Sequence, residues 1–143
     1  MIIYEDILRE FQKQKIKYVL VGGIAVNLLG YMRTTADLDI LVEMSNSNLK
    51  KIVNILKKQG YGVKQPVDPI GIADEKIRKD WIKNKHMKAL NFYKEREFKE
   101  VDVVIDSPVP YDIAKKEVKR IKIADMILHV ISIKHLIRMK QKT

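Results

Sequence analysis

The 143-residue sequence contains no cysteine, no low-complexity segment and no long hydrophobic run. Without cysteine the chain can form neither disulfides nor thiolate metal sites, and its composition fits a reducing compartment. The longest apolar stretch, residues 18–32, is interrupted by Asn27 and is shorter than the roughly 20 residues that a membrane helix requires. The first ten residues, MIIYEDILRE, carry acids where a signal peptide has a basic leader. These absences predict a cytoplasmic protein with no membrane partner.

The patterns that are present predict one domain, residues 1–143, of the α+β (α/β-like) class. Apolar residues at helical spacing indicate helices, and alternating or short apolar runs indicate strands. Stretches rich in proline are expected to be surface connections, at residues 65–73 and 107–116. The predicted helices cover residues 4–14, 24–31, 45–61, 74–87 and 133–143, and the predicted strands cover residues 17–23, 35–43, 88–94, 98–106, 117–123 and 127–131.

The net charge of +10 is concentrated in the second half of the chain. Residues 1–75 hold 10 Lys and Arg against 9 Asp and Glu, whereas residues 76–143 hold 18 against 9. A basic half favours phosphate-rich partners such as nucleic acid. Many lysines and isoleucines are equally expected from an AT-rich genome or a thermophile. Charge alone leaves these two interpretations open.

Two aspartates interrupt an otherwise apolar strand in the segment TADLDILVE. Side chains alternate between the faces of a strand, so Leu38, Ile40 and Val42 can enter the core while Asp37 and Asp39 share the other face. Residues two apart lie roughly 6.5–7 Å from each other along a strand. The two aspartates can therefore hold a common cation or a pair of cations.

The segment FKEVDVVID repeats this design further along the chain. Its valines can face the core, which leaves Glu100, Asp102 and Asp106 on the opposite face. If the two strands are neighbours, Asp102 completes a cluster of three carboxylates with Asp37 and Asp39. Such a cluster is strongly self-repulsive unless a cation neutralises it, and its oxygen ligands favour Mg²⁺ or Mn²⁺.

Phosphate-binding candidates lie on either side of the helix that precedes the first acidic strand. Gly22 and Gly23 stand where a strand passes into this helix, so their N–H groups can receive phosphate oxygens. The pair matches neither the dinucleotide-binding nor the P-loop fingerprint. If residues 33–39 are extended, Arg33 and Thr35 lie on the same face as the aspartates, a mixture suited to a cation and a phosphate together.

The segment GGIAVNLLGYMRTTADLDILV resembles the signature of nucleotidyltransferase-fold proteins of the DNA polymerase β superfamily. It is most similar to small prokaryotic members related to AbiEii-type toxins and minimal nucleotidyltransferases. The later segments KIRKDWIKNKHM and ISIKHLIRMK extend the resemblance over most of the chain. The resemblance implies a mixed central sheet with helices packed on it, an NTP substrate and two Mg²⁺ ions.

Carried over residue by residue, the resemblance assigns the triphosphate to Gly22 and Gly23, and the metal ions to Asp37 and Asp39. Asp102 would hold the catalytic metal and help to deprotonate the attacking hydroxyl. The predicted nucleotide-binding set is completed by Arg33, Thr35, Lys85 and Lys140.

Two functions of different classes follow. The leading hypothesis is a nucleotidyltransferase that transfers NMP from an NTP to a hydroxyl on RNA, a protein or a small molecule, with a toxin–antitoxin system as one setting. The alternative is a non-catalytic module of the same fold that binds nucleic acid or a partner protein. Three intact carboxylates favour the enzyme. Gly23, which stands where many members carry serine, and an end at Thr143 favour the alternative.

Overall fold

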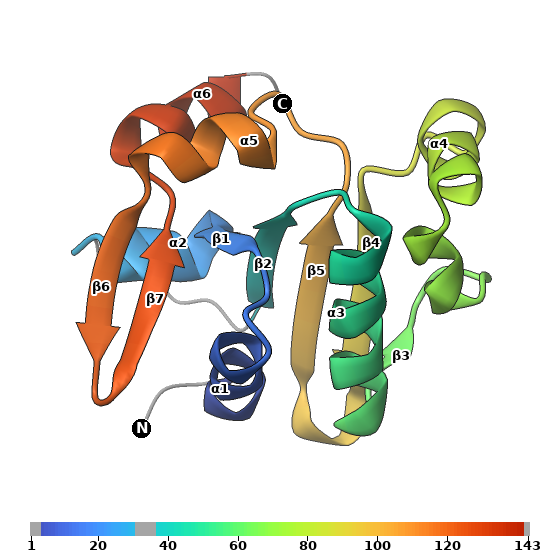
Figure 1. Cartoon of the computed structure of the whole chain (residues 1–143), viewed down its shortest axis with the longest axis horizontal. Helices are drawn as coiled ribbons and strands as arrows, with labels where there is room; N and C mark the ends of the chain where they lie inside the picture. Colours follow the sequence, from blue (N-terminus) through green and yellow to red (C-terminus); the bar gives the residue numbers. More distant parts are fainter. Residues whose placement is uncertain (1–3, 31–36, 142–143) are drawn as a thin grey trace.

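A computed structural model describes residues 4–30 and 37–141 and shows one mixed sheet flanked by helices (Figure 1). The seven strands lie in the order β3-β4-β5-β2-β1-β7-β6. They are β1 (Tyr18–Val21), β2 (Asp37–Val42), β3 (Gly62–Val63), β4 (Ala89–Lys94), β5 (Lys99–Val104), β6 (Lys119–Ile123) and β7 (Met126–Val130). The predicted α+β architecture with a mixed central sheet is confirmed.

Six α-helices and three short 3-10 turns connect these strands within the described residues. The helices are α1 (Glu5–Lys13), α2 (Gly22–Leu28), α3 (Asn46–Lys58), α4 (Glu75–Asn84), α5 (Tyr111–Ala114) and α6 (Ile133–Gln141). The 3-10 turns are η1 (Pro69–Ala73), η2 (Glu95–Glu97) and η3 (Lys115–Glu117). Across residues 4–30 and 37–141, no helix combines the length and the apolar character that a membrane crossing requires.

The core lies under the apolar faces of the central strands β2 and β5. Leu38 and Ile40 on β2, and Val101 and Val103 on β5, are almost fully buried, as strand alternation predicts. Helices α1 and α3 lie together on one side of the sheet (Figure 1). Each contributes an apolar stripe to the core, formed by Ile7, Leu8 and Phe11 in α1 and by Leu49, Ile52, Val53, Ile55 and Leu56 in α3.

Side-chain caps fix the beginnings of three helices close to where the sequence predicts them. The Ser45 hydroxyl accepts from the backbone N–H of Asn48 (3.3 Å) at the start of α3. The Asp74 carboxylate accepts from the first turn of α4, and the Ser132 hydroxyl accepts from the first turn of α6. Each cap satisfies a helical N–H group that has no partner within its own helix.

The two predicted connections contain short elements that periodicity did not reveal. Residues 107–116, predicted as a plain connection, hold α5 and the beginning of η3, and residues 65–73 end in η1. Strand β3 was also absent from the predicted elements. These elements have two to five residues, too few for a helical or alternating pattern to repeat.

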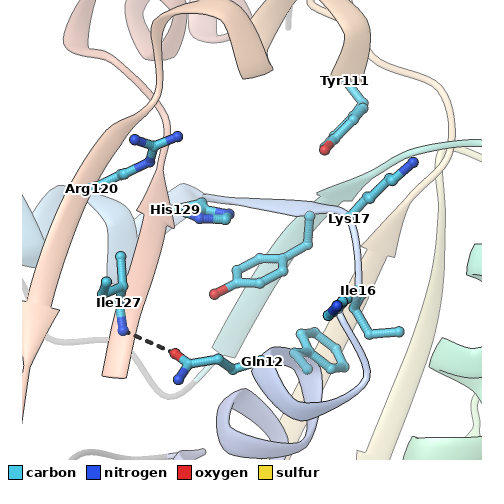
Figure 2. A pocket seen from close by; sticks show the side chains of 10 residues that line it. Gln12, Ile16, Lys17, Tyr111, Arg120, Ile127 and His129 are labelled. Carbon is cyan, nitrogen blue, oxygen red and sulfur yellow. Dashed lines mark hydrogen bonds between the residues drawn. The ribbon is translucent and has the colours of Figure 1, made fainter. Parts of the chain in front are cut away.

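Strand β1 is short, and this leaves part of β7 unpaired on the edge that faces away from β6. The two strands pair at Leu20 and Val130, whereas β7 already begins at Met126. The end of α1 takes the place of the missing strand, because the Gln12 side chain accepts from the backbone N–H of Ile127 at 3.0 Å (Figure 2). A cavity of about 530 Å³ lies at this position.

Asn48 ties the beginning of α3 to the ends of β1 and β2 from a buried position. Its side-chain amide donates to the carbonyl oxygens of Lys17 and Glu43, each at 3.0 Å, and its oxygen accepts from the backbone N–H of Lys17 at 2.9 Å. Since Asn48 is only 6% exposed, water cannot replace these three bonds without a change of structure.

Replacing Asn48 with alanine is expected to lower the free energy of unfolding by about 2–4 kcal/mol, because three hydrogen bonds between a buried side chain and the backbone are lost. Urea denaturation of the two proteins measures the difference. The matched control is Asn54→Ala on the exposed side of the same helix, which should change stability by no more than about 0.5 kcal/mol. Equal losses in the two variants would contradict the role assigned to Asn48.

Candidate functional site

The two acidic strands are neighbours, and their parallel register brings their carboxylates together. In the β2–β5 ladder Asp37 is paired with Glu100, and Asp39 is paired with Asp102. Partners in a ladder project from the same face of the sheet. The condition on which the three-carboxylate hypothesis depended is therefore met by the topology.

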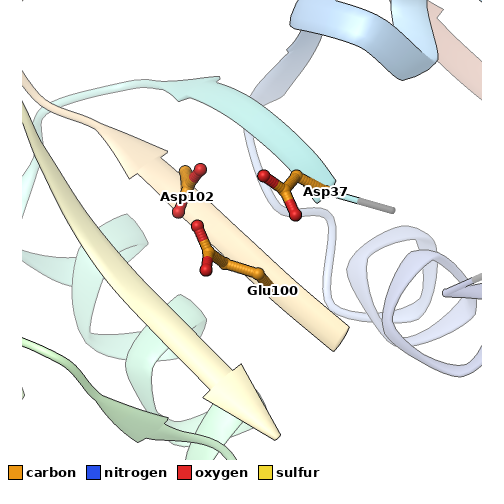
Figure 3. A group of neighbouring side chains, drawn as sticks. All are labelled: Asp37, Glu100 and Asp102. Atoms are coloured by element: carbon orange, nitrogen blue, oxygen red, sulfur yellow. The ribbon is translucent and has the colours of Figure 1, made fainter. Parts of the chain in front are cut away.

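The tightest group in the cluster consists of Asp37, Glu100 and Asp102 (Figure 3). Each offers a carboxylate oxygen, and these oxygens all lie within 4.8 Å of one another. All three residues are partly buried. Sequence reasoning placed Glu100 on the acidic face but did not select it as a ligand. The available signal was its spacing, because it precedes Asp102 by two residues, as Asp37 precedes Asp39.

Asp39 lies beside this group, against the glycine turn that opens α2. The structure places the Asp39 carboxylate so close to Gly22 that a Cβ atom on Gly22 would overlap it. Gly22 also has a φ of 72°, a conformation that residues with a side chain rarely adopt. Gly22 therefore allows the chain to turn into α2 and leaves room for the Asp39 carboxylate at the same time.

Crowding of negative charge changes the protonation of Asp102. Burial, and after it contact with Asp39 and Glu100, raises the pKa of Asp102 to about 8. A hydrogen bond from the Asn91 amide (2.6 Å) acts in the opposite direction, because it stabilises the charged form. Without a bound cation, this site thus holds a proton that an isolated aspartate would have lost.

One lysine compensates part of the charge. Lys64, which follows β3, forms an ion pair with Glu100, and this contact lowers the pKa of the Glu100 carboxyl. Glu100 is accordingly ionised, and the Lys64 charge also acts on Asp102, more weakly than on Glu100.

A fixed amide orients Asp102 from the neighbouring strand β4. Asn91 is paired with Asp102 in the β4–β5 ladder. The Gln65 side chain donates to the Asn91 side-chain oxygen (2.5 Å) and accepts from the Asn91 backbone N–H (3.0 Å). This leaves the Asn91 NH₂ group pointing at Asp102. Sequence reasoning missed Lys64, Gln65 and Asn91, because their position depends on the register of β3 with β4 and of β4 with β5.

The other predicted nucleotide-binding residues are spread more widely. Gly23 lies in the first turn of α2, next to Gly22. Lys85 is exposed at the end of α4. Lys140 lies on α6, a helix that Figure 1 shows on the opposite side of the molecule from α4. Arg33 and Thr35 lie outside the described residues.

The donor set suits a hard divalent cation. The carboxylate cluster supplies only oxygen ligands, which Mg²⁺ and Mn²⁺ prefer over the nitrogen and sulfur ligands typical of Zn²⁺. The raised pKa of Asp102 is consistent with a cation site, because a cation at this position would relieve the repulsion among the carboxylates.

Solved structures of low sequence identity share this fold. A candidate nucleotidyltransferase from Thermotoga maritima, TM1012, superposes with a TM-score of 0.64 at 12% identity, covering 98% of this chain and 81% of that one. The lincosamide antibiotic adenylyltransferase LnuA, bound to lincomycin, gives 0.58 at 20% identity, with 92% and 79% covered. ANT(2")-Ia in complex with adenylyl-2"-tobramycin gives 0.55 at 15% identity, with 91% and 67% covered. At these identities the likeness establishes the fold.

No curated protein matches the chain by sequence. A family described as "uncharacterised nucleotidyltransferase" matches residues 2–142. The resemblance to nucleotidyltransferases is thus confirmed at the level of family and fold. Because the match spans nearly the whole sequence, this chain belongs to that nucleotidyltransferase family.

Proposed function

We propose that the protein transfers a nucleoside monophosphate from an NTP to a hydroxyl group and that it requires Mg²⁺ or Mn²⁺. The parallel register of β2 and β5 is the observation that carries this proposal, because it gathers carboxylates from two strands on one partly buried face. Family membership supplies the reaction class. A solvated acidic strand face would not need two matched strands or a fixed amide at Asp102.

Asp37, Asp39 and Asp102 would hold the metal, and Glu100 lies within reach of the same ions. Bound divalent ions supply Lewis-acid activation of the attacking oxygen and stabilisation of the leaving group. In the reaction the acceptor oxygen attacks the α-phosphorus and forms the new O–P bond, while the bond to the β-phosphate oxygen breaks and pyrophosphate leaves. Asp102 takes the hydroxyl proton on a carboxylate oxygen, held in place by the Asn91 amide.

The triphosphate would lie at the beginning of α2, beside Gly22 and Gly23. The absence of a side chain at Gly22 keeps the Asp39 carboxylate and the backbone of the turn in direct contact, so that phosphate and metal can be bound next to each other. Arg33, Thr35, Lys85 and Lys140 complete the predicted nucleotide-binding set, in which Arg33, together with Lys85 or Lys140, would neutralise phosphate charge.

Two kinds of acceptor have separate support. One structural neighbour binds lincomycin and another holds adenylylated tobramycin, which supports a hydroxylated small molecule. The basic second half of the chain supports RNA, and a protein within a toxin–antitoxin system is the third option. Incubation with α-³²P-labelled NTPs and, in turn, cell RNA, lysate protein and a panel of hydroxylated small molecules identifies the acceptor by the product that carries the label.

Gly23 supports a second candidate, a nucleotide-binding module without turnover. Many members of the superfamily carry a serine at this position that contacts phosphate, and this chain lacks it. Saturable binding of Mg²⁺–NTP in calorimetry, without label transfer to any acceptor class, would favour this candidate over the enzyme.

Asp39→Asn and Asp102→Asn are each expected to lower the rate of NMP transfer by roughly 10²–10³-fold, because each replaces a negatively charged metal ligand with a neutral amide. Pyrophosphate release at saturating Mg²⁺ measures the loss. Asp106→Asn is the matched control, since Asp106 lies beyond the end of β5 and accepts from Lys88 at 2.7 Å. If the control loses as much activity as the two variants, the carboxylate cluster is not the metal site.

A pair of glycine substitutions tests the contact between Gly22 and Asp39. Both Gly22 and Gly30 have positive φ, so alanine at either position should cost about 1 kcal/mol of stability from backbone strain. Only at Gly22 would the new methyl group displace the Asp39 carboxylate, because at Gly30 no atom of the described residues, apart from its chain neighbours, lies within 4 Å of the corresponding position. Gly22→Ala should therefore weaken Mg²⁺ binding in calorimetry, and Gly30→Ala should leave it unchanged.

Stability of the metal-free protein should depend on pH through Asp102. Its pKa of about 8 in the folded state exceeds the value of about 3.9 in an unfolded chain, so the folded state binds more protons between these values. Stability supplied by the protonated carboxyl is therefore lost as pH rises towards 8. Asp102→Asn removes this loss, and its melting temperature in EDTA should exceed that of the wild type by a margin that grows from pH 5 to pH 8.

Addition of Mg²⁺ at pH 8 should reverse this order by stabilising the wild type alone. If the difference in melting temperature between Asp102→Asn and the wild type in EDTA does not change with pH, Asp102 is ionised in the metal-free protein. That result would contradict the expected protonation of Asp102.

A further inference from the structure

The cavity beside the beginning of β1, here called the β1–β7 cavity, is separate from the carboxylate cluster. It is enclosed by α1, the turn into β1, the β6–β7 hairpin and α5 (Figure 2). Tyr18 forms part of its wall and is paired with Val42, whereas Asp39 is paired with Val21 at the other end of the same ladder. The two ends are three residues apart, roughly 10 Å along the strand, and Tyr18 and Asp39 project from opposite faces.

The lining of the cavity carries positive charge and no carboxylate. Lys15 and Lys17 reach it from the turn into β1, and Arg120 reaches it from β6. Lys17 is ion-paired with Glu43 at 3.3 Å, whereas within the described part of the chain neither Lys15 nor Arg120 has an acidic partner at ion-pair distance. The cavity therefore offers two uncompensated cations to an anionic ligand.

Aromatic side chains line the same space. Tyr18 and the His129 imidazole are stacked, with ring centroids 5.6 Å apart and planes 25° from parallel, and Phe11 packs behind Tyr18 at 5.3 Å. Tyr111 contributes a further ring from α5 (Figure 2). Burial and the nearby Arg120 charge lower the pKa of His129, so its ring is neutral at physiological pH and can stack on a flat ligand.

The size of the cavity indicates a small molecule rather than a side chain from a partner. Its volume of about 530 Å³ falls within the roughly 300–1,000 Å³ of ligand pockets. A ligand that satisfies this lining must combine a flat aromatic group with a phosphate-like anion. An uncharged lipid would leave the cations without a counter-charge, and an inorganic anion would leave the aromatic side chains uncovered.

We propose that the β1–β7 cavity is a second binding site, specific for a nucleoside phosphate, with the base against His129, which Tyr18 supports from behind, and Tyr111, and with the phosphate at Arg120 and Lys15. It lies apart from the proposed transfer site and needs no divalent cation. Occupancy would join α1, β1 and the β6–β7 hairpin through one ligand.

Calorimetric titration of the full chain with AMP, ADP and GMP in EDTA tests this site, because chelation removes metal-dependent binding at the carboxylates. Saturable binding with a Kd below about 1 mM is expected. Adenosine lacks the phosphate and inorganic phosphate lacks the base, so each should bind at least about tenfold more weakly than AMP. Asp39→Asn should leave AMP binding unchanged, which separates this site from the proposed transfer activity.

Arg120→Gln should weaken AMP binding about tenfold, as expected for the loss of a charge-assisted hydrogen bond. Lys119→Gln is the matched control, because it removes the same charge from the adjacent exposed residue on the other face of β6. Melting temperatures confirm that both variants are folded.

The proposal is overturned by the absence of mononucleotide binding, by equal losses in Arg120→Gln and Lys119→Gln, or by binding that requires Mg²⁺ or Asp39. Binding of a single-stranded oligonucleotide without binding of any mononucleotide would also overturn it, since the surface would then be a nucleic-acid interface.

Discussion

Repulsion among carboxylates on β2 and β5 is the constraint that the rest of the structure accommodates. The burial of Leu38 and Ile40 against the core fixes the register of β2, because a slip of one residue would turn both aspartates inward. The same holds for β5, where Val101 and Val103 are buried. Hydrophobic burial on one face of the sheet thus supplies the free energy that holds like charges together on the other.

Opposite charge elsewhere in the molecule complements this cluster. The chain has a net charge of +10, and the lysines and arginine of β6 lie on an edge strand that β1 and β7 separate from β2. A molecule of net positive charge attracts polyphosphates over long range, while the negative site itself accepts them only with a cation. Selectivity for a metal–nucleotide complex over free nucleotide can follow from this arrangement alone.

Strand alternation explains how much of the fold and site was predictable. The acidic faces of β2 and β5, the glycine turn at Gly22 and the caps at Ser45, Asp74 and Ser132 are local features that can be read from a few neighbouring residues. Contributions from Lys64 and Asn91 could not be predicted, because they depend on the register between β3, β4 and β5. The turn η1 and helix α5 were missed because they are too short to show a period.

The short ladder of β1 has a mechanical consequence for the β6–β7 hairpin. One register pair with β1, a bond from the Ile131 N–H to the Leu20 carbonyl (3.0 Å) and the contacts of α1 through Arg9 and Gln12 join this hairpin to the sheet. The inner face of β7 is nevertheless part of the core, because Met126, Leu128 and Val130 are almost fully buried. Apolar side-chain packing, rather than a backbone ladder, therefore holds most of this hairpin against the sheet.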